Sequence, residues 1–137
     1  MKKSILIVLI ISAFHLVQAT NSGSNDKKVD IAIKIINLMN KGKFTESTNH
    51  FDTTMKSKVS PEMLKQIWNS IKIQNGDFIK IEESDTEKYN QYNLVYLKSL
   101  FSKQGVVFQF TFNKENLLSG FFLKEQYYPE KKKKEKK

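Results

Sequence analysis

Residues 106–112 read Val-Val-Phe-Gln-Phe-Thr-Phe, and this alternation decides the fold class. Successive side chains of a β-strand point to opposite faces, so the first valine and the three phenylalanines face one way, whereas Val107, Gln109 and Thr111 face the other. One face of this strand is therefore strongly apolar and the other is mixed. We expect a strand whose apolar face packs on other elements of the domain.

Three more strands are predicted around this one, over residues 78–83, 93–102 and 117–125. The turn at residues 103–105 and the hairpin turn at 113–116 leave only short connections, which favours antiparallel pairing. Gly120 inside the last strand indicates a bulge or a point of close packing.

The residues before position 78 follow helical periodicity instead. The pattern predicts an amphipathic helix over 27–41, closed by Gly42, and a short second helix over 44–51. Ser60 and Pro61 are a strong start signal for a third helix, which ends in the turn at 75–77. Three helices followed by four strands indicate an α+β fold, with the N-terminal helices on one face of a four-stranded antiparallel sheet.

The N-terminus has the three parts of a secretory signal peptide. Lys2 and Lys3 precede an apolar run over residues 5–16, and Val17-Gln18-Ala19 then offers compact residues at a cleavage site. A membrane span needs about 20 apolar residues, and this run is shorter and is interrupted by His15. We therefore expect cleavage near Ala19 and export to the periplasm or the medium.

Cleavage would leave one domain with little room for a second. We expect a signal peptide over 1–19, a flexible linker over 20–28, a single α+β domain over 29–126 and a lysine-rich disordered tail over 127–137. The chain has no cysteine, so the exported domain has to rely on its apolar core without disulfide support.

The formal net charge of +9 comes mostly from the two ends of the chain. Lys2 and Lys3 leave with the leader and the tail holds a net charge of about +4, so the body is nearly balanced. The chain contains no arginine, the residue favoured for phosphate and base contacts, which argues against specific nucleic-acid recognition. The tail from Lys131 to Lys137 is either a solvated end or a weak, salt-screened attachment to anionic surfaces.

Most catalytic and metal-binding patterns are missing from the sequence. It has no Gly-x-Ser-x-Gly elbow, and cleavage of the leader leaves His50 as the single histidine. One histidine without cysteine excludes the usual zinc sites. The acidic run at Glu82, Glu83, Asp85 and Glu87 is either a solvated strand end or a weak site for a hard cation, although it lacks the spacing of a calcium loop. We expect no catalytic residue, metal or cofactor.

Several short motifs together carry a family resemblance. They are Asn40-Lys41-Gly42-Lys43-Phe44, Phe51-Asp52, Met55-Lys56, Ser60-Pro61-Glu62-Met63-Leu64, Trp68 and Gly76-Asp77-Phe78. The chain resembles, over residues 29–123, a small bacterial domain of unknown function that often precedes an α/β-hydrolase domain in exported proteins. That domain is similar to the cone-shaped nuclear transport factor two-like fold. The resemblance implies a curved sheet and carries no catalytic residues.

Relatives of the cone fold often use the space between sheet and helices as a ligand pocket. If such a pocket exists here, the resemblance implies an aromatic lining by Trp68, Tyr96, Phe108, Phe110 and Phe122. The alternative is that these aromatic side chains only fill a core. Tyr96 stands out because a buried phenol needs a hydrogen-bond partner.

Three functions follow as hypotheses. The first is an exported, non-catalytic module that binds a protein or a small apolar ligand through the sheet or the cone mouth. The second is an accessory or regulatory domain; because no hydrolase sequence follows the matching residues, it would act on a separately encoded hydrolase. The third is a small enzyme that uses a carboxylate and a tyrosine in the cone pocket. Sheet-mediated dimers are common in such cones, so a homodimer through the sheet is also considered.

Overall fold

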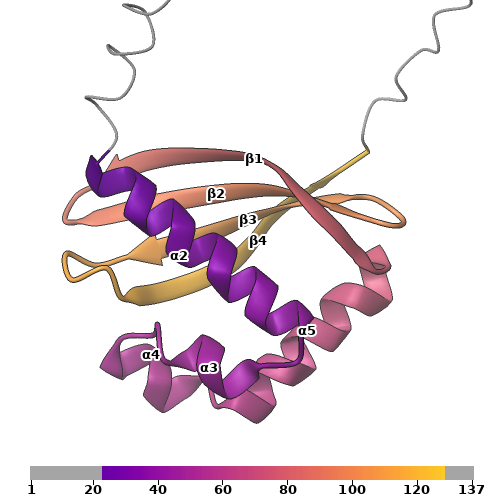
Figure 1. Ribbon diagram of the computed structural model, residues 1–137, viewed down its shortest axis with the longest axis horizontal. Coiled ribbons are helices and arrows are strands. Elements are labelled where there is room, and N and C mark those ends of the chain that lie inside the picture. The colour runs from indigo at the N-terminus through magenta and orange to yellow at the C-terminus, as the bar shows by residue number, and fades with distance from the viewer. Residues whose placement is uncertain (1–22, 129–137) are drawn as a thin grey trace, which may run out of the picture.

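The computed structural model describes residues 23–128, which form four helices followed by four strands (Figure 1). The predicted signal peptide and the tail beyond residue 128 lie outside the described residues. The elements are α2 (Gly23–Asn40), α3 (Phe44–Thr48), α4 (Thr53–Lys58), α5 (Pro61–Asn75), β1 (Phe78–Tyr89), β2 (Tyr92–Phe101), β3 (Gly105–Phe112) and β4 (Leu118–Tyr127).

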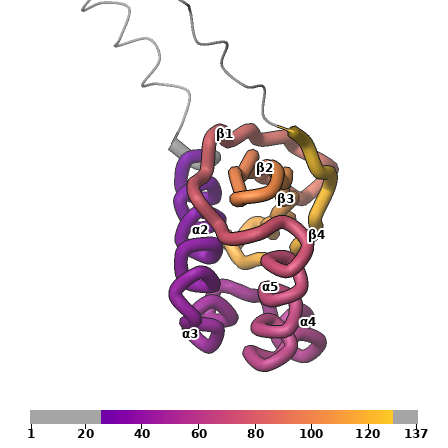
Figure 2. The backbone as a smooth tube through the Cα atoms, turned by 90° about the vertical axis from the view of Figure 1, so that its right-hand side faces the viewer, coloured from indigo at the N-terminus to yellow at the C-terminus, as the bar shows by residue number. Residues whose placement is uncertain are grey.

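The four strands form one antiparallel sheet in the order β1-β2-β3-β4, which confirms the predicted α+β fold. β2 and β3 pair without interruption, whereas bulges interrupt the pairing of β1 with β2 and of β3 with β4. Bulges bend a strand and increase its twist. The sheet is accordingly curved, and Figure 2 shows β1 curling around the inner strands.

The core lies between the helices and the inner face of the sheet. The four inward-facing residues of β3, Val106, Phe108, Phe110 and Phe112, are fully buried, as the alternation predicted. Trp68 of α5 packs on this face, with ring centroids 5.9 Å from Phe101 and 6.5 Å from Phe108. Each such side chain stabilises the fold by about 1.5–3 kcal/mol when it leaves water. The inner face is therefore the main source of stability.

The helical half differs from the prediction at two places. α2 begins at Gly23 rather than at residue 27, so residues 23–28, expected in the linker, are helical. A polar first turn buries little apolar surface, and hydrophobic periodicity does not detect it. The short helix α4 was not predicted, because a helix of six residues shows too little hydrophobic periodicity. Asp52 is its N-cap: the side chain accepts a hydrogen bond from the backbone N–H of Met55 at 2.8 Å.

Two strands are also longer than predicted. β1 continues to Tyr89 instead of ending at residue 83, and a two-residue turn, in which Asn90 has a φ of 53°, leads directly into β2. The extension is polar and lies at the sheet edge, so it lacks the apolar alternation that marks a half-buried strand. β4 continues to Tyr127, which therefore belongs to the sheet and not to the tail.

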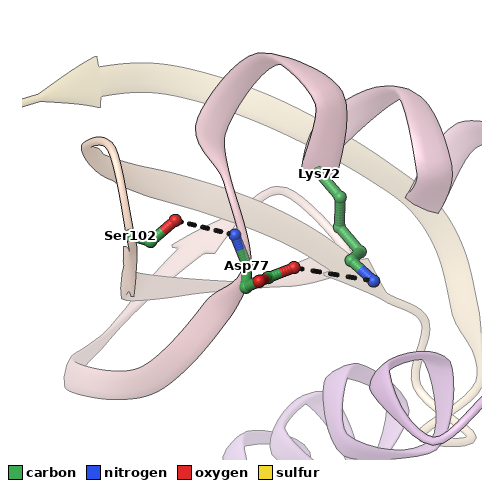
Figure 3. A network of polar contacts seen from close by, with 3 residues as sticks. All are labelled: Lys72, Asp77 and Ser102. Atoms are coloured by element: carbon green, nitrogen blue, oxygen red, sulfur yellow. Dashed lines mark hydrogen bonds and ion pairs between the residues drawn. The ribbon is translucent and has the colours of Figure 1, made fainter.

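A polar junction joins α5 to the sheet (Figure 3). The Asp77 N–H donates to the Ser102 hydroxyl at 2.9 Å, and the Ser102 N–H donates to the Asp77 carbonyl at 2.8 Å. Lys72 adds an ion pair with Asp77 at 3.9 Å. Gly76 adopts a φ of 86°, and a Cβ there would collide with the Ser102 side chain. The junction thus fixes the sheet relative to α5. No helix within residues 23–128 is long and apolar enough to cross a membrane.

Candidate functional site

The structure does not bring the five predicted pocket residues together. Trp68, Phe108 and Phe110 are buried in the core between helices and sheet. Tyr96 and Phe122 lie on the opposite, outer face, because they alternate with inward-facing neighbours on β2 and β4. The core aromatics contact one another with centroid distances between 5.1 and 6.5 Å, as packed rings do.

The outer face is the first candidate site. Within residues 23–128 no helix packs on it, and its side chains are mostly half-buried or exposed. Asp85, Tyr96, Gln109 and Phe122 form one row across the four strands, because each pairs with the next in register. Phe122 is 58% exposed, and its ring bends over Gly120 on the same strand. An aromatic side chain is thus presented to solvent in a row that is otherwise polar.

Two tyrosines on this face are held by carboxylates and lysines. Tyr96 donates its hydroxyl hydrogen to Glu87 at 2.9 Å, and the Lys124 ammonium lies 4.3 Å from the centroid of its ring. A lysine over an aromatic ring is a favourable contact. The hydroxyl of Tyr96 therefore contacts β1 through Glu87, and its ring contacts β4 through Lys124.

Tyr127 repeats the arrangement at the far end of the face. It donates to Glu82 at 2.6 Å, and Lys98 lies 4.8 Å from the centroid of its ring. The ring covers Gly105, where a Cβ would collide with it. A side chain of β4 thus crosses β3 and β2 to reach a residue of β1, the strand at the opposite edge of the sheet.

The same contacts raise the pKa of both phenols. Burial contributes most to the raised pKa of Tyr96, followed by the hydrogen bond to Glu87 and its charge. Burial likewise leads for Tyr127, followed by the hydrogen bond and charge of Glu82, and its pKa is raised strongly above the usual 10.0. A raised pKa makes the phenolate harder to form, so both hydroxyls stay hydrogen-bond donors to their carboxylates to a higher pH than an ordinary tyrosine would.

A shallow groove of about 210 Å³ runs along this face. Tyr96 and Val107 contribute to its lining, together with acidic residues such as Glu83 and the two lysines Lys98 and Lys124. Of the five residues predicted to line a pocket, only Tyr96 lines this groove. The groove has a small apolar part, from Tyr96 and Val107, with charged residues of both signs around it.

A second and larger cleft, of about 330 Å³, lies at the end of the sheet where the two hairpin turns meet the start of α4. Its lining is polar and includes Asp52, Tyr92, Asn113 and Ser119. Asp52 accepts one hydrogen bond on each carboxylate oxygen, from the Met55 N–H at 2.8 Å and from the Ser119 hydroxyl at 2.7 Å. The carboxylate is thereby fixed in place.

The remaining titratable candidates stay apart. His50 is partly buried, and burial, followed by the nearby charge of Lys34, lowers its pKa below 6.5. The acidic run on β1 is exposed along the strand. Among the described residues no three side chains of histidine, cysteine, aspartate or glutamate gather in a group that could hold a metal ion.

The sequence did not predict the larger cleft at the end of the sheet, which we call the hairpin-end cleft. It also did not predict the hydrogen bond between Tyr127 and Glu82. The cleft joins residues that lie as far as 67 positions apart, such as Asp52 and Ser119. Its only local signal is the N-cap pattern at Asp52, which precedes a helix too short for periodicity to reveal.

Comparison with known protein families gave one match: the model of the DUF3887 family, described as proteins of unknown function, covers residues 32–121. No curated protein and no solved structure matched the chain.

Proposed function

The chain belongs to the DUF3887 family of proteins of unknown function, and we propose that it is an exported, non-catalytic module that binds a partner protein through the outer face of its sheet. One observation carries this proposal. On the outer face Phe122 is exposed and Tyr96 and Val107 are half-buried, with no helix of the described residues over them. An exposed aromatic side chain beside half-buried apolar neighbours can anchor a partner, since aromatic residues are enriched among binding hot spots.

Three features support a non-catalytic role. Of the five aromatic residues that would line a cone pocket, Trp68, Phe108 and Phe110 fill the core instead. The two tyrosines of the outer face donate their hydroxyl hydrogens to Glu87 and Glu82, and their raised pKa values disfavour the phenolate that a base or nucleophile would need. Asp52, which lines the larger cleft, is the N-cap of α4 and accepts a hydrogen bond from the Ser119 hydroxyl. A general base needs a free carboxylate beside its substrate, and the hydrogen bonds of Asp52 serve the fold.

The charges of the outer face specify the chemistry of the partner. Glu83, Asp85 and Glu87 are exposed on β1, at one edge of the face, whereas Phe122 lies near the other edge on β4. A complementary surface would be apolar where it receives Phe122 and positively charged where it faces β1. Opposite charges at the rim orient a complex and speed association more than they tighten it.

Photo-crosslinking in extracts of the native cell envelope tests the proposal. The mature chain carries Phe122→benzoylphenylalanine, and a matched control carries Ile73→benzoylphenylalanine on α5, where the native side chain is 75% exposed. We expect one protein to crosslink at position 122 alone. The product should decrease when excess unmodified chain competes, and also in an Asp85→Lys background. Equal labelling at positions 73 and 122 would contradict the proposal.

Light scattering distinguishes a foreign partner from a second copy of the chain. We expect the mature protein to stay monomeric over a concentration series. A dimer that forms with concentration and disappears in Phe122→Ser would assign the face to self-association, and the partner proposal would then be wrong.

Export is a separate element of the proposal. We expect the mature protein in the periplasmic or culture fraction, with an N-terminus at Thr20, as measured by intact mass and N-terminal sequencing. Recovery of the chain with its leader intact, in the membrane fraction, would contradict it. We also expect the lysine tail to add weak binding to anionic vesicles, which salt should screen. Equal binding by a chain truncated after Glu130 would remove that role.

A further inference from the structure

The hairpin-end cleft has no part in partner binding on the outer face, and we propose that it binds a neutral polyhydroxylated ligand, a sugar ring. The turn between β1 and β2, the turn between β3 and β4, and the start of α4 surround it (Figure 1). Its volume of about 330 Å³ is at the lower end of the range for small-molecule sites and suits a single ring.

The walls of the cleft are fixed before any ligand arrives. The side-chain oxygen of Asn113 accepts hydrogen bonds from the backbone N–H groups of Glu115 and Leu117, at 2.9 and 3.1 Å. Asp52 holds Ser119 at 2.7 Å, as described above. Beneath them, the Asp52 N–H donates to the carbonyl of Leu118 at 2.8 Å, which ties α4 to β4. A preorganised site loses less entropy when a ligand binds.

The groups left over are those that pair with hydroxyls. The carbonyl oxygen of Asn113 is occupied by two backbone donors, so its NH₂ group remains as a donor toward a ligand. Glu115 supplies an acceptor, Gln91 supplies both kinds of group, and Tyr92 adds an aromatic ring with a hydroxyl. A sugar hydroxyl donates one hydrogen bond and accepts others, so it can satisfy acids and amides together. The apolar face of its ring can lie on Tyr92.

The charge of the lining argues against ions as ligands. Asp52 and Glu115 outnumber the single lysine, Lys114, so the cleft carries a formal net charge of −1 and disfavours phosphates. Metal ions are disfavoured as well, since the described residues contain no group of three or more ligands. A neutral ligand with many hydroxyls fits this lining better than either.

An NMR titration of the mature full-length chain tests the proposal. The probes are N-acetylglucosamine, glucose, inorganic phosphate and glucosamine, which carries a positive charge. We expect amide shifts confined to residues around 52, 91–92 and 113–119 with a neutral sugar, and a dissociation constant of about 1 mM for a shallow site of this size. Phosphate should cause no such shifts.

Two variants and one control complete the test. Tyr92→Ala should weaken sugar binding about tenfold through loss of the ring. Glu115→Gln should weaken it about threefold, since within residues 23–128 Glu115 takes part in hydrogen bonding through its backbone N–H, which leaves its carboxylate for a ligand. Tyr89→Ala is the matched control: Tyr89 pairs with Tyr92 across the strands but lies outside the cleft lining. It should bind like the wild type.

Three results would overturn the sugar site. They are the absence of shifts with both neutral sugars, tighter binding of glucosamine or phosphate than of N-acetylglucosamine, and equal loss of binding in Tyr89→Ala and Tyr92→Ala. None of these outcomes bears on crosslinking at position 122, so the two proposals fail separately.

Discussion

The two faces of the sheet use aromatic residues for different purposes. On the inner face, Phe108 and Phe110 are fully buried and contact other rings. On the outer face, Phe122 is exposed. Tyr96 donates its hydroxyl hydrogen to Glu87, and Lys124 lies over its ring. The inner rings therefore stabilise the fold through burial, whereas the outer rings form a surface whose composition the fold does not require. Aromatic content alone does not reveal which role a residue has.

The largest expected effect separates these two roles. Phe108→Ala should lower the free energy of unfolding by about 3–5 kcal/mol, because it leaves a cavity in the core. Phe122→Ala should change it by no more than about 0.5 kcal/mol, since its ring is mostly in water. Guanidinium unfolding of both variants measures the difference. Similar losses for the two would refute the assignment of the faces.

A second prediction concerns a polar group on the buried side. Asn75 is fully buried at the end of α5; its amide donates to the Ile71 carbonyl at 2.8 Å and its oxygen accepts from Gln104 at 2.6 Å and Gln126 at 2.9 Å. Asn75→Ala leaves two amide donors without a partner and should cost about 1–3 kcal/mol.

The matched control for that variant is Asn69→Ala on the exposed side of the same helix. It should have almost no effect in the same unfolding experiment. A neutral Asn75→Ala would show that the buried hydrogen bonds of Asn75 add nothing measurable to stability.

The smallest effect is on the outer face and depends on pH. The pKa of Tyr127 is raised in the fold above its unfolded value of 10.0, so the protonated phenol is the stabilising form. Its contribution is complete below pH 10 and is lost as the pH rises beyond that value. The difference in unfolding free energy between the wild type and Tyr127→Phe should therefore shrink above pH 10.

Absorbance of tyrosinate measures the same shift directly. In Glu82→Gln the phenol keeps an acceptor but loses the charge beside it, so the pKa of Tyr127 should move back toward 10.0. An unchanged titration in this variant would show that Glu82 does not raise the pKa.

Much of the fold was predictable because its signals are local. The alternation at residues 106–112 and the Ser60-Pro61 start of α5 both proved correct. The polar end of β1 and the short helix α4 were not predicted. An exposed edge strand and a six-residue helix bury too little apolar surface to produce a periodic hydrophobic pattern in the sequence.

The candidate sites were less predictable than the fold. Periodicity shows that Phe110 and Phe122 lie on strands, but the face of each depends on register, and a shift of one residue reverses it. The bulge between β3 and β4 changes that register within the last strand. The contact of Tyr127 with Glu82, 45 positions apart, joins the two edge strands and has no local sequence signal.

Crosslinking from the middle of the outer face tests the central claim most directly. The photo-reactive group is placed by Gln109→benzoylphenylalanine, next to Tyr96 and Phe122 in register, and the yield is compared in otherwise wild-type, Phe122→Ser and Phe108→Leu chains. We predict that Phe122→Ser abolishes the partner product at unchanged stability, whereas Phe108→Leu retains it at reduced stability. Loss of the product in Phe108→Leu together with its retention in Phe122→Ser would contradict the claim that the outer face binds the partner.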